Sequence, residues 1–237
     1  QKVLVKDLSE RFDVSESMIR KDLKTLDTAA IPDALDSLNI NGGLTGITPQ
    51  TEKCNLVGQA YTIQYIEPTE SEKKQKNAAN FIDDIPEGYI PVLANNGRMD
   101  CTVWGDILTD VAIKKGIPGT VIDGLCRDIR HIRDCSYKMF SKGVFMQSGK
   151  GRTVMSASKV AVKIGEVHIK FGDYIRGDEN GIVVIPQEHV DQVIQMAKIV
   201  VDKEKKIRNM IKKGERLDIA RETFNYSHAW EDKDEIF

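Results

Sequence analysis

The chain is poor in cysteine and has no long apolar run, and each of these features excludes certain classes of protein. Its four cysteines, among 237 residues, form no Cys-x-x-Cys pair, which argues against a zinc ribbon or a redox dithiol. We expect four reduced thiols. No apolar run reaches the about 18 residues of a membrane span, and no signal peptide is visible. We therefore expect a cytoplasmic protein that does not contact a membrane.

A surplus of basic charge is also missing. The 34 Lys and Arg residues nearly balance the 36 Asp and Glu residues, so the formal net charge is -2. A nucleic-acid-binding protein usually presents a basic face, and the overall composition gives no sign of one. Hydrophobic residues make up 41% of the chain, which is ordinary for a globular protein. The length suits one large domain with a small appendage.

The first 27 residues predict two short helices joined by a tight turn. Ser15 suits the N-cap of the second helix, and Glu16 falls in its first turn, where the helix dipole favours an acid. The apolar stripe of that helix recurs at helical spacing in Ile19, Leu23 and Leu26. We predict a helix-turn-helix segment over residues 1–27.

The amino-acid sequence of this segment identifies its type more specifically than its apolar periodicity does. "VKDLSERFDVSESMIRKDLKTL" closely resembles the DNA-reading half of repressors of the deoxyribose-operon repressor family. The resemblance implies DNA contacts by Ser15, Ser17, Arg20 and Lys21. The first helix and the β-hairpin wing of that fold are not found in the sequence, and the segment holds six basic and six acidic residues. DNA binding and a purely structural helical hairpin both stay open.

Residues 28–214 predict an α/β domain. "YIPVLAN" and "TVIDGL" are apolar strands with the helical pattern "GDILTDVAIKKG" between them, which predicts a parallel pair. An earlier helix in "TAAIPDALDSLNINGG" should end at Asn41-Gly42-Gly43, residues that tolerate a left-handed backbone. The second half turns β-rich, and a long helix then runs to Gly214. We expect the polar tail, residues 215–237, to be flexible.

An adjacent Arg and Asp follow the strand "TVIDG", and another acid opens the preceding helix. In open α/β sheets, ligands bind beyond the carboxyl ends of the strands, where Arg127 and Asp128 should lie. The first N–H groups of the helix from Gly105 could bind a carboxylate. Arg127 could hold a carboxylate or keto oxygen, and Asp128 a hard cation such as Mg²⁺. These parts predict a pocket for a small 2-oxo acid bound to a metal. The alternative is an ordinary surface ion pair.

The same stretch carries a second resemblance. "VWGDILTDVAIKKGIPGTVIDGLCRD" is very similar to the core of the 4-hydroxy-4-methyl-2-oxoglutarate aldolase and regulator of ribonuclease activity A family. "TAAIPDALD", "VGQAYTI" and "GDYIRGDENGIVVIP" extend the similarity to residues 25–215. The resemblance implies a layered β/β/α swivelling-type α/β domain, with a helix-turn-helix fragment before it and a long C-terminal helix. Aldolases of this family carry Asp-x20-Arg-Asp, which Asp106, Arg127 and Asp128 complete.

The resemblance also implies roles for single residues. Backbone amides of Gly105, Asp106, Ile107 and Leu108 would bind the substrate carboxylate. Arg127 would hold the keto oxygen and stabilise an enolate, Asp128 would anchor Mg²⁺ or Mn²⁺ largely through waters, and Asp106 would support the site. The family builds this site between subunits of a trimer, so a homotrimer or a dimer of trimers is expected. The neighbouring subunit would supply the acids Asp33 and Glu204. For Glu204, an ordinary charge on an exposed helix is the alternative.

The expected function is a divalent-metal-dependent lyase of small 2-oxo acids. Retro-aldol cleavage of 4-hydroxy-4-methyl-2-oxoglutarate and decarboxylation of oxaloacetate both leave the enolate of pyruvate, so one class II site could serve both. The runner-up is a helix-turn-helix transcriptional regulator whose aldolase-like domain senses a keto acid. A non-catalytic interaction protein, like the ribonuclease regulators, is a third alternative.

Overall fold

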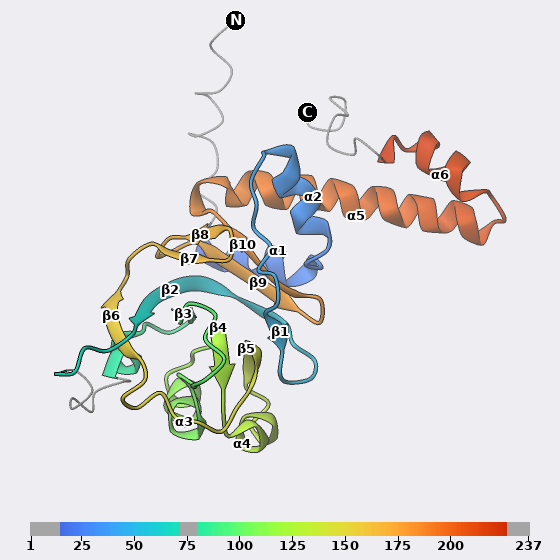
Figure 1. Ribbon diagram of the computed structural model, residues 1–237. Coiled ribbons are helices and arrows are strands. Elements are labelled where there is room, and N and C mark those ends of the chain that lie inside the picture. Colours follow the sequence, from blue (N-terminus) through green and yellow to red (C-terminus); the bar gives the residue numbers. More distant parts are fainter. Residues whose placement is uncertain (1–14, 72–79, 227–237) are drawn as a thin grey trace, which may run out of the picture.

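The computed structural model describes residues 15–71 and 80–226, and it shows a mixed α/β fold built on one curled sheet (Figure 1). The strand order is β1-β5-β4-β3-β2-β9-β10, and β6 pairs with the far end of β2. Residues of β10 and the segment before β1 also approach, since Gly43 bridges Val183. The sheet is therefore nearly closed, and the predicted α/β class is confirmed.

The centre of the sheet is the predicted parallel unit. Its elements are β3 (Tyr89–Ala94), α3 (Asp106–Lys114), β4 (Gly119–Cys126), α4 (Ile129–Asp134) and β5 (Lys138–Val144). All eight residues of β4 are buried, as an apolar strand covered on both faces requires. Because β3 and β4 run parallel, the chain segments that follow them emerge at one edge of the sheet.

One long strand joins this unit to the antiparallel part. The 11 residues of β2 (Leu56–Ile66) pair with β3 along one side, and with β9 and then β6 along the other. The antiparallel strands of this sheet are β1 (Thr48–Pro49), β6 (Val154–Ser158), β9 (Tyr174–Asp178) and β10 (Gly181–Ile185). The hairpin of β7 (Val162–Ile164) and β8 (Val167–Ile169) forms a separate two-stranded sheet. The expected β-rich second half is confirmed.

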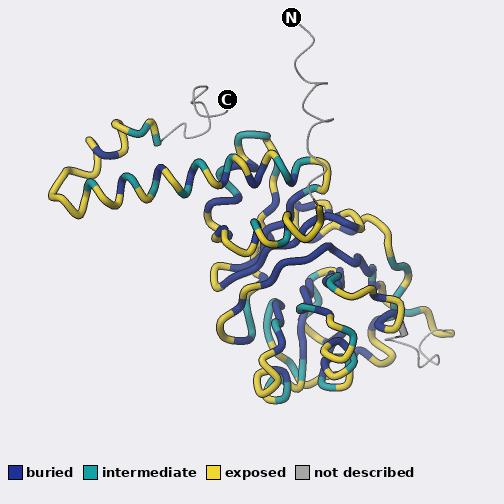
Figure 2. The backbone as a smooth tube through the Cα atoms, turned by 180° about the vertical axis from the view of Figure 1, so that it is seen from behind, coloured by how far each residue is buried: buried dark blue, intermediate teal, exposed yellow. Residues whose placement is uncertain are grey.

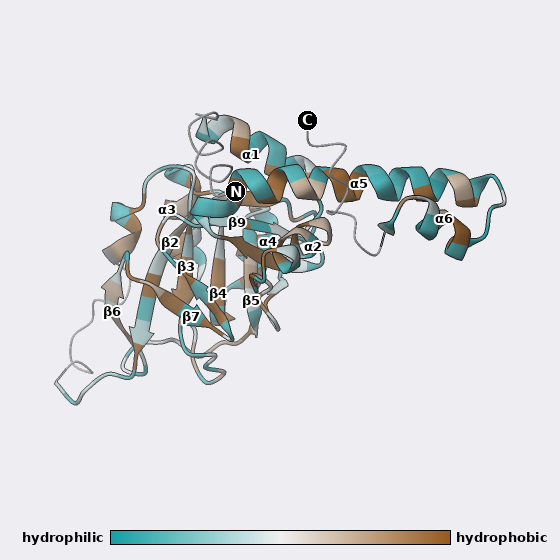
Figure 3. Cartoon of the chain, turned by 90° about the horizontal axis from the view of Figure 1, so that it is seen from above, coloured by the Kyte–Doolittle hydropathy of each residue, from teal (hydrophilic) through white to brown (hydrophobic). Residues whose placement is uncertain are grey.

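Helices cover the sheet in two places. In Figure 1, α3 and α4 lie below the sheet, while α2 (Ala30–Ser37) and α5 (Val190–Lys212) lie above it. A short 3-10 helix, η2 (Asn80–Asp84), follows the undescribed residues 72–79, and another, η3 (Gln187–His189), precedes α5. Figure 2 shows burial concentrated in the strands, and Figure 3 shows hydrophobic residues gathered there.

The N-terminal helix α1 (Glu16–Thr25) packs into the main body of the protein. Ile19, Leu23 and Leu26 belong to the same buried cluster as the apolar residues of α2 and α5. Ser15 occupies the N-cap position as predicted, but its hydroxyl contacts Ser17 and makes no capping bond. The partner helix predicted from residues 1–14 lies outside the described residues. Domain boundaries at residues 27 and 214 stay predictions.

A buried polar anchor joins the α1–α2 connection to the β9–β10 hairpin. Asp178 accepts hydrogen bonds from the Thr28 backbone N–H at 2.8 Å and from the Thr28 hydroxyl at 2.6 Å. The Arg176 guanidinium lies 3.7 Å from the same carboxylate and donates to the Leu26 carbonyl. This anchor holds the end of α1 against the sheet.

One predicted helix end was wrong. Helix α2 ends at Ser37, and Asn39 takes the left-handed backbone, with φ of 56°, before the expected Asn41-Gly42-Gly43 stop. Gly42 instead permits close approach, since a Cβ there would lie 2.3 Å from the Val184 carbonyl oxygen. The long helix does stop at Gly214, but the tail beyond it is not all irregular. Residues Leu217–Thr223 form α6, which packs back on α5 through the buried Ala220.

Candidate functional site

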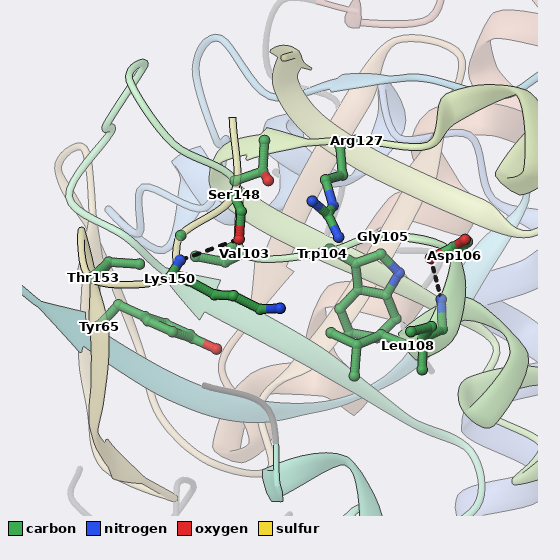
Figure 4. Close-up of a pocket in the computed structure, with 13 residues that line it drawn as sticks. Tyr65, Val103, Trp104, Gly105, Asp106, Leu108, Arg127, Ser148, Lys150 and Thr153 are labelled. Atoms are coloured by element: carbon green, nitrogen blue, oxygen red, sulfur yellow. Dashed lines mark hydrogen bonds between the residues drawn. The ribbon is translucent and has the colours of Figure 1, made fainter. Parts of the chain in front are cut away.

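A pocket of about 210 Å³ lies beyond the carboxyl ends of the parallel strands (Figure 4). It is lined by Tyr65, Thr102, Val103, Trp104, Gly105, Asp106, Ile107, Leu108, Arg127, Ser148, Gly149, Lys150 and Thr153. The size suits a molecule of a few heavy atoms. The structure therefore brings Gly105–Leu108 and Arg127 to one cavity.

The pocket forms because the segment before α3 runs along the end of β4. The Val103 N–H donates to the Leu125 carbonyl at 3.3 Å, and the Arg127 N–H donates to the Trp104 carbonyl at 3.0 Å. Trp104 itself is buried, stacks on Tyr137 and donates its indole N–H to another buried group. These contacts hold the beginning of α3 beside the Arg-Asp pair.

The three acid and base groups singled out from the sequence meet here. Asp128 Oδ2 lies 3.2 Å from Arg127 Nε and accepts the Asp106 backbone N–H, also at 3.2 Å. Asp106 turns its own carboxylate to the Ile107 N–H at 2.7 Å. The Asp128 carboxylate thus contacts the side chain of Arg127 and the backbone of Asp106, which lies 22 residues earlier in the sequence.

The backbone at this point is specialised. Asp128 has a φ of 55°, a left-handed conformation that costs a non-glycine residue about 1 kcal/mol or more and occurs often at functional sites. A Cβ on Gly105 would lie 2.5 Å from Asp128 Oδ2 and 3.2 Å from Arg127 Nε. Gly105 is therefore the residue that lets the Asp128 carboxylate approach the helix.

The N-terminus of α3 differs in detail from the predicted carboxylate site. Two of its free N–H groups, those of Asp106 and Ile107, already bind the carboxylates of Asp128 and Asp106. A helix start has unsatisfied donors, and neighbouring acids are their natural partners. An incoming carboxylate would have to compete with these side chains or use the remaining amides.

Arg127 keeps most of its binding capacity for the cavity. Among the described residues, Arg127 makes its side-chain ion pair through Nε, so the two terminal nitrogens are left to a ligand. The side chain is 36% exposed, and Figure 4 shows the guanidinium pointing into the pocket. Such a fork can hold two oxygens of a small acid.

Sequence reasoning missed Tyr65, Ser148 and Lys150. Figure 4 shows Lys150 reaching into the pocket between Tyr65 and Arg127, from the loop after β5. Tyr65 is 1% exposed, and burial raises the pKa of its phenol, so it stays neutral. The Gly149-Lys150-Gly151 run was the available signal for a turn. The position of Lys150 between Tyr65 and Arg127 depends on backbone pairing between distant segments, which the local sequence does not reveal.

Asp33 and Glu204 lie elsewhere in this chain. They belong to α2 and α5, on the opposite side of the sheet from α3 and α4 in Figure 1. Burial, then the charges of Asp36 and Glu204, raise the pKa of Asp33. Glu204 is half-buried, accepts the Tyr226 hydroxyl at 2.8 Å and pairs with Arg208 at 2.8 Å. The two acids are therefore apart from the Arg127 pocket within one chain, and their role in a site stays a prediction.

Only some of the predicted DNA-contact residues are exposed to a ligand. Ser15, Ser17 and Lys21 are exposed on α1. Arg20 is half-buried and folds over Gly88, where an added Cβ would lie 2.3 Å from its Nη1. The structure therefore gives Arg20 a packing role in the protein itself.

The donor set at the pocket suits a hard divalent cation. The Asp128 contacts all use Oδ2, which leaves Oδ1 without a partner among the described residues. One carboxylate with room for several waters is the arrangement Mg²⁺ prefers. Asp128 and the half-buried Asp106 are the residues that could hold it.

None of the described helices is long and apolar enough to cross a membrane.

The fold is thus a curled mixed sheet with a pocket beyond its parallel strands. A family model described as RraA-like, aldolase/RraA, matches residues 28–184. The chain belongs to the aldolase/RraA family. A model of the DeoR-like helix-turn-helix domain also matches residues 1–31. Both predicted resemblances are confirmed.

Several known proteins resemble the chain over most of its length. Protein DlpA of Legionella pneumophila is 39% identical over 203 residues, which cover 86% of this chain and 33% of DlpA. The chain thus spans about a third of that relative. A Halalkalibacterium halodurans protein named "Putative 4-hydroxy-4-methyl-2-oxoglutarate aldolase" is 32% identical, covering 74% of this chain and 80% of that one. The crystal structure of an uncharacterized protein from Pseudomonas syringae superposes with a TM-score of 0.79 at 42% identity, covering 88% of this chain and 98% of that one.

Proposed function

We propose that the chain is a divalent-metal-dependent lyase of small 2-oxo acids. Asp106 and Arg127 line one small pocket and Asp128 contacts both of them, and this arrangement carries the proposal. The aldolase names of relatives at 30–32% identity support the reaction class. We take 4-hydroxy-4-methyl-2-oxoglutarate and oxaloacetate as substrates, since cleavage of either leaves the enolate of pyruvate.

Arg127 is the group that stabilises the developing negative charge. Its terminal nitrogens face the cavity while Asp128 holds Nε, so the guanidinium is oriented before the substrate arrives. Fixed positive charge aimed at a forming oxyanion lowers the barrier most when it needs no reorganisation. Loss of this cation alone should remove most of the turnover.

Asp128 and Asp106 complete the polar side of the pocket. Asp128 would hold Mg²⁺ or Mn²⁺, largely through waters, and Asp106 would keep the start of α3 in place. When bound, such a cation supplies Lewis-acid stabilisation of charge on the substrate oxygens. The substrate carboxylate would compete with Asp106 for the Ile107 N–H, and the amide of Leu108 lies one residue further along the pocket lining.

A second subunit would complete the site. We propose a homotrimer in which Asp33 and Glu204 of one chain face the Arg127 pocket of another. Burial and the neighbouring acids raise the pKa of Asp33, which makes its carboxylate a better proton acceptor. A water held between these acids would take the 4-hydroxyl proton and later return a proton to the enolate carbon.

The test is pyruvate release from both substrates by purified protein. Arg127→Ala should abolish release while the circular dichroism spectrum and melting temperature stay unchanged. Arg130→Ala, at an exposed arginine in the first turn of α4, is the matched control and should keep full activity. Normal activity of Arg127→Ala would refute the proposed role of this pocket.

A ligand-sensing regulator is the second candidate. The match of residues 1–31 to a DeoR-like helix-turn-helix domain favours it, as do the exposed Ser15, Ser17 and Lys21. Pyruvate binding without any turnover, together with pyruvate-dependent DNA binding, would support the regulator over the lyase. A non-catalytic interaction protein is disfavoured because the Asp-x20-Arg-Asp set is intact.

A further inference from the structure

A cluster of three different metal-ligating side chains lies beside the pocket but takes no part in it. Asp110 on α3 and His131 on α4 meet with Oδ1 and Nε2 at 2.7 Å. Cys135, at the C-cap of α4, places its Sγ 3.6 Å from the same nitrogen. The three ligand atoms all lie within 4.8 Å of one another.

The spacing in sequence explains why the cluster forms. His131 and Cys135 are four residues apart, so α4 presents both on one face. Asp110 is one turn beyond Asp106 on α3, and α3 packs against α4. The cluster is therefore supported by two helices, and both of these helices begin at the Arg127 pocket.

The geometry is close to that of a bound transition metal. With Zn–N of about 2.05 Å and Zn–S of about 2.3 Å, tetrahedral ligands stand about 3.5 Å apart, which matches the His131–Cys135 distance. Two N/O ligands would stand about 3.3 Å apart, so Asp110 must move about half an ångström from its hydrogen bond. The Asp110 side chain is 64% exposed and can make that shift.

The ligand chemistry selects the ion. An imidazole, a thiolate and a carboxylate form a donor set of the borderline type that suits Zn²⁺ or Co²⁺, whereas Mg²⁺ prefers all-oxygen sites. The hydrogen bond to Asp110, with the charges of Asp106 and Asp134, raises the pKa of His131, so a metal would displace a proton that these acids favour. Three protein ligands leave a fourth position open to water.

We propose that Asp110, His131 and Cys135 form a second metal site, specific for a borderline divalent transition metal such as Zn²⁺. It is separate from the all-oxygen site at Asp128. A metal bound there would fasten α3 to α4, and thereby fix the two helix starts that carry Asp106 and Asp128. The proposal does not depend on lyase activity.

Co²⁺ is the probe, because a thiolate ligand gives Co²⁺ a charge-transfer band that water and carboxylate ligands do not. The full chain, reduced and then freed of metal and reductant, should show this band on titration with Co²⁺, and Zn²⁺ should displace it. Cys135→Ser should abolish the band. His131→Ala should weaken Co²⁺ binding by at least about tenfold, since changes outside the first ligand shell already cost that much.

Two controls separate this site from others. His168→Ala removes an exposed histidine on β8, and Asp128→Asn removes the acid of the pocket. Both variants should keep the band. A wild-type protein without a thiolate band would overturn the proposal, as would a band that survives in Cys135→Ser or is unchanged in His131→Ala. Circular dichroism of each variant establishes that the fold is intact.

Discussion

The sharpest test of the pocket geometry changes a residue that has no side chain. In Gly105→Ala the new Cβ would lie 2.5 Å from Asp128 Oδ2, whereas ordinary contacts begin at 3.4 Å. The carboxylate must therefore withdraw by about 0.9 Å, the difference between these distances. Arg127 is bound to the same oxygen and would move with it. All functional groups stay present, and only their placement changes.

The expected effect is large on turnover and small on stability. A displacement of about 1 Å in a catalytic group can cost about 100-fold in rate, or roughly 2.7 kcal/mol. Gly105 has an extended backbone, with φ of -159°, which alanine also adopts. Alanine is a poorer N-cap than glycine, so the free energy of unfolding should fall by no more than about 1 kcal/mol.

The measurement is kcat/KM for pyruvate release, with the melting temperature recorded in parallel. Gly43→Ala is the control, because an added Cβ at Gly43 meets nothing within 4 Å. It should match wild type in both assays. If Gly105→Ala kept kcat/KM within about threefold of wild type, the position of Asp128 would not matter to the reaction, and the reasoning would fail.

Two further predictions concern how the N-terminal segment is held. Leu23→Ala should lower the free energy of unfolding by about 3 kcal/mol in denaturant titrations, because this leucine is fully buried, whereas the exposed Met18→Ala should have no effect. Equal stability of both variants would mean that α1 is detached from the core. Burial acts to raise the pKa of Asp178, but hydrogen bonds from Thr28 and the charge of Arg176 outweigh it and lower the pKa below its ordinary value of 3.8. The ionised form therefore stabilises the fold above that pH, and the contribution is lost as the pH falls through the folded-state pKa. Asp178→Asn should cost about 3 kcal/mol at pH 7 and flatten the loss of stability below pH 4. An unchanged acid limb in pH-dependent unfolding would contradict the assignment.

Much of the fold was predictable because the strands and the helix of its central unit follow one another directly in the sequence. Apolar strands flanking a helical pattern indicated the parallel pair β3 and β4, and the carboxyl-end rule then located Arg127 and Asp128. The helix start at Gly105 was predicted to bind a carboxylate, although in the structure the carboxylate that binds there is the Asp128 side chain. These features depend on short stretches of sequence and on one rule of sheet topology.

The remaining features depend on contacts between distant segments. Lys150 reaches the pocket only because the loop after β5 is drawn to Thr102 by backbone pairing. From the sequence, Glu204 could not be distinguished from a solvated charge on a helix. Its contact with Tyr226 exists because the chain after α5 turns back along that helix. Capping of the α3 amides by Asp106 and Asp128 likewise requires the three-dimensional arrangement. Local periodicity carries no information on such pairings.

The central claim is that this chain uses a divalent cation at Asp128 to release pyruvate from a 2-oxo acid. The most direct measurement is pyruvate release from oxaloacetate by the full chain with Mg²⁺, after chelation, and after Mg²⁺ is restored, in parallel with Asp128→Ala. We predict turnover that chelator abolishes and Mg²⁺ restores, and none in the variant at any Mg²⁺ concentration. Turnover that is indifferent to chelator, or that survives in Asp128→Ala, would contradict the account.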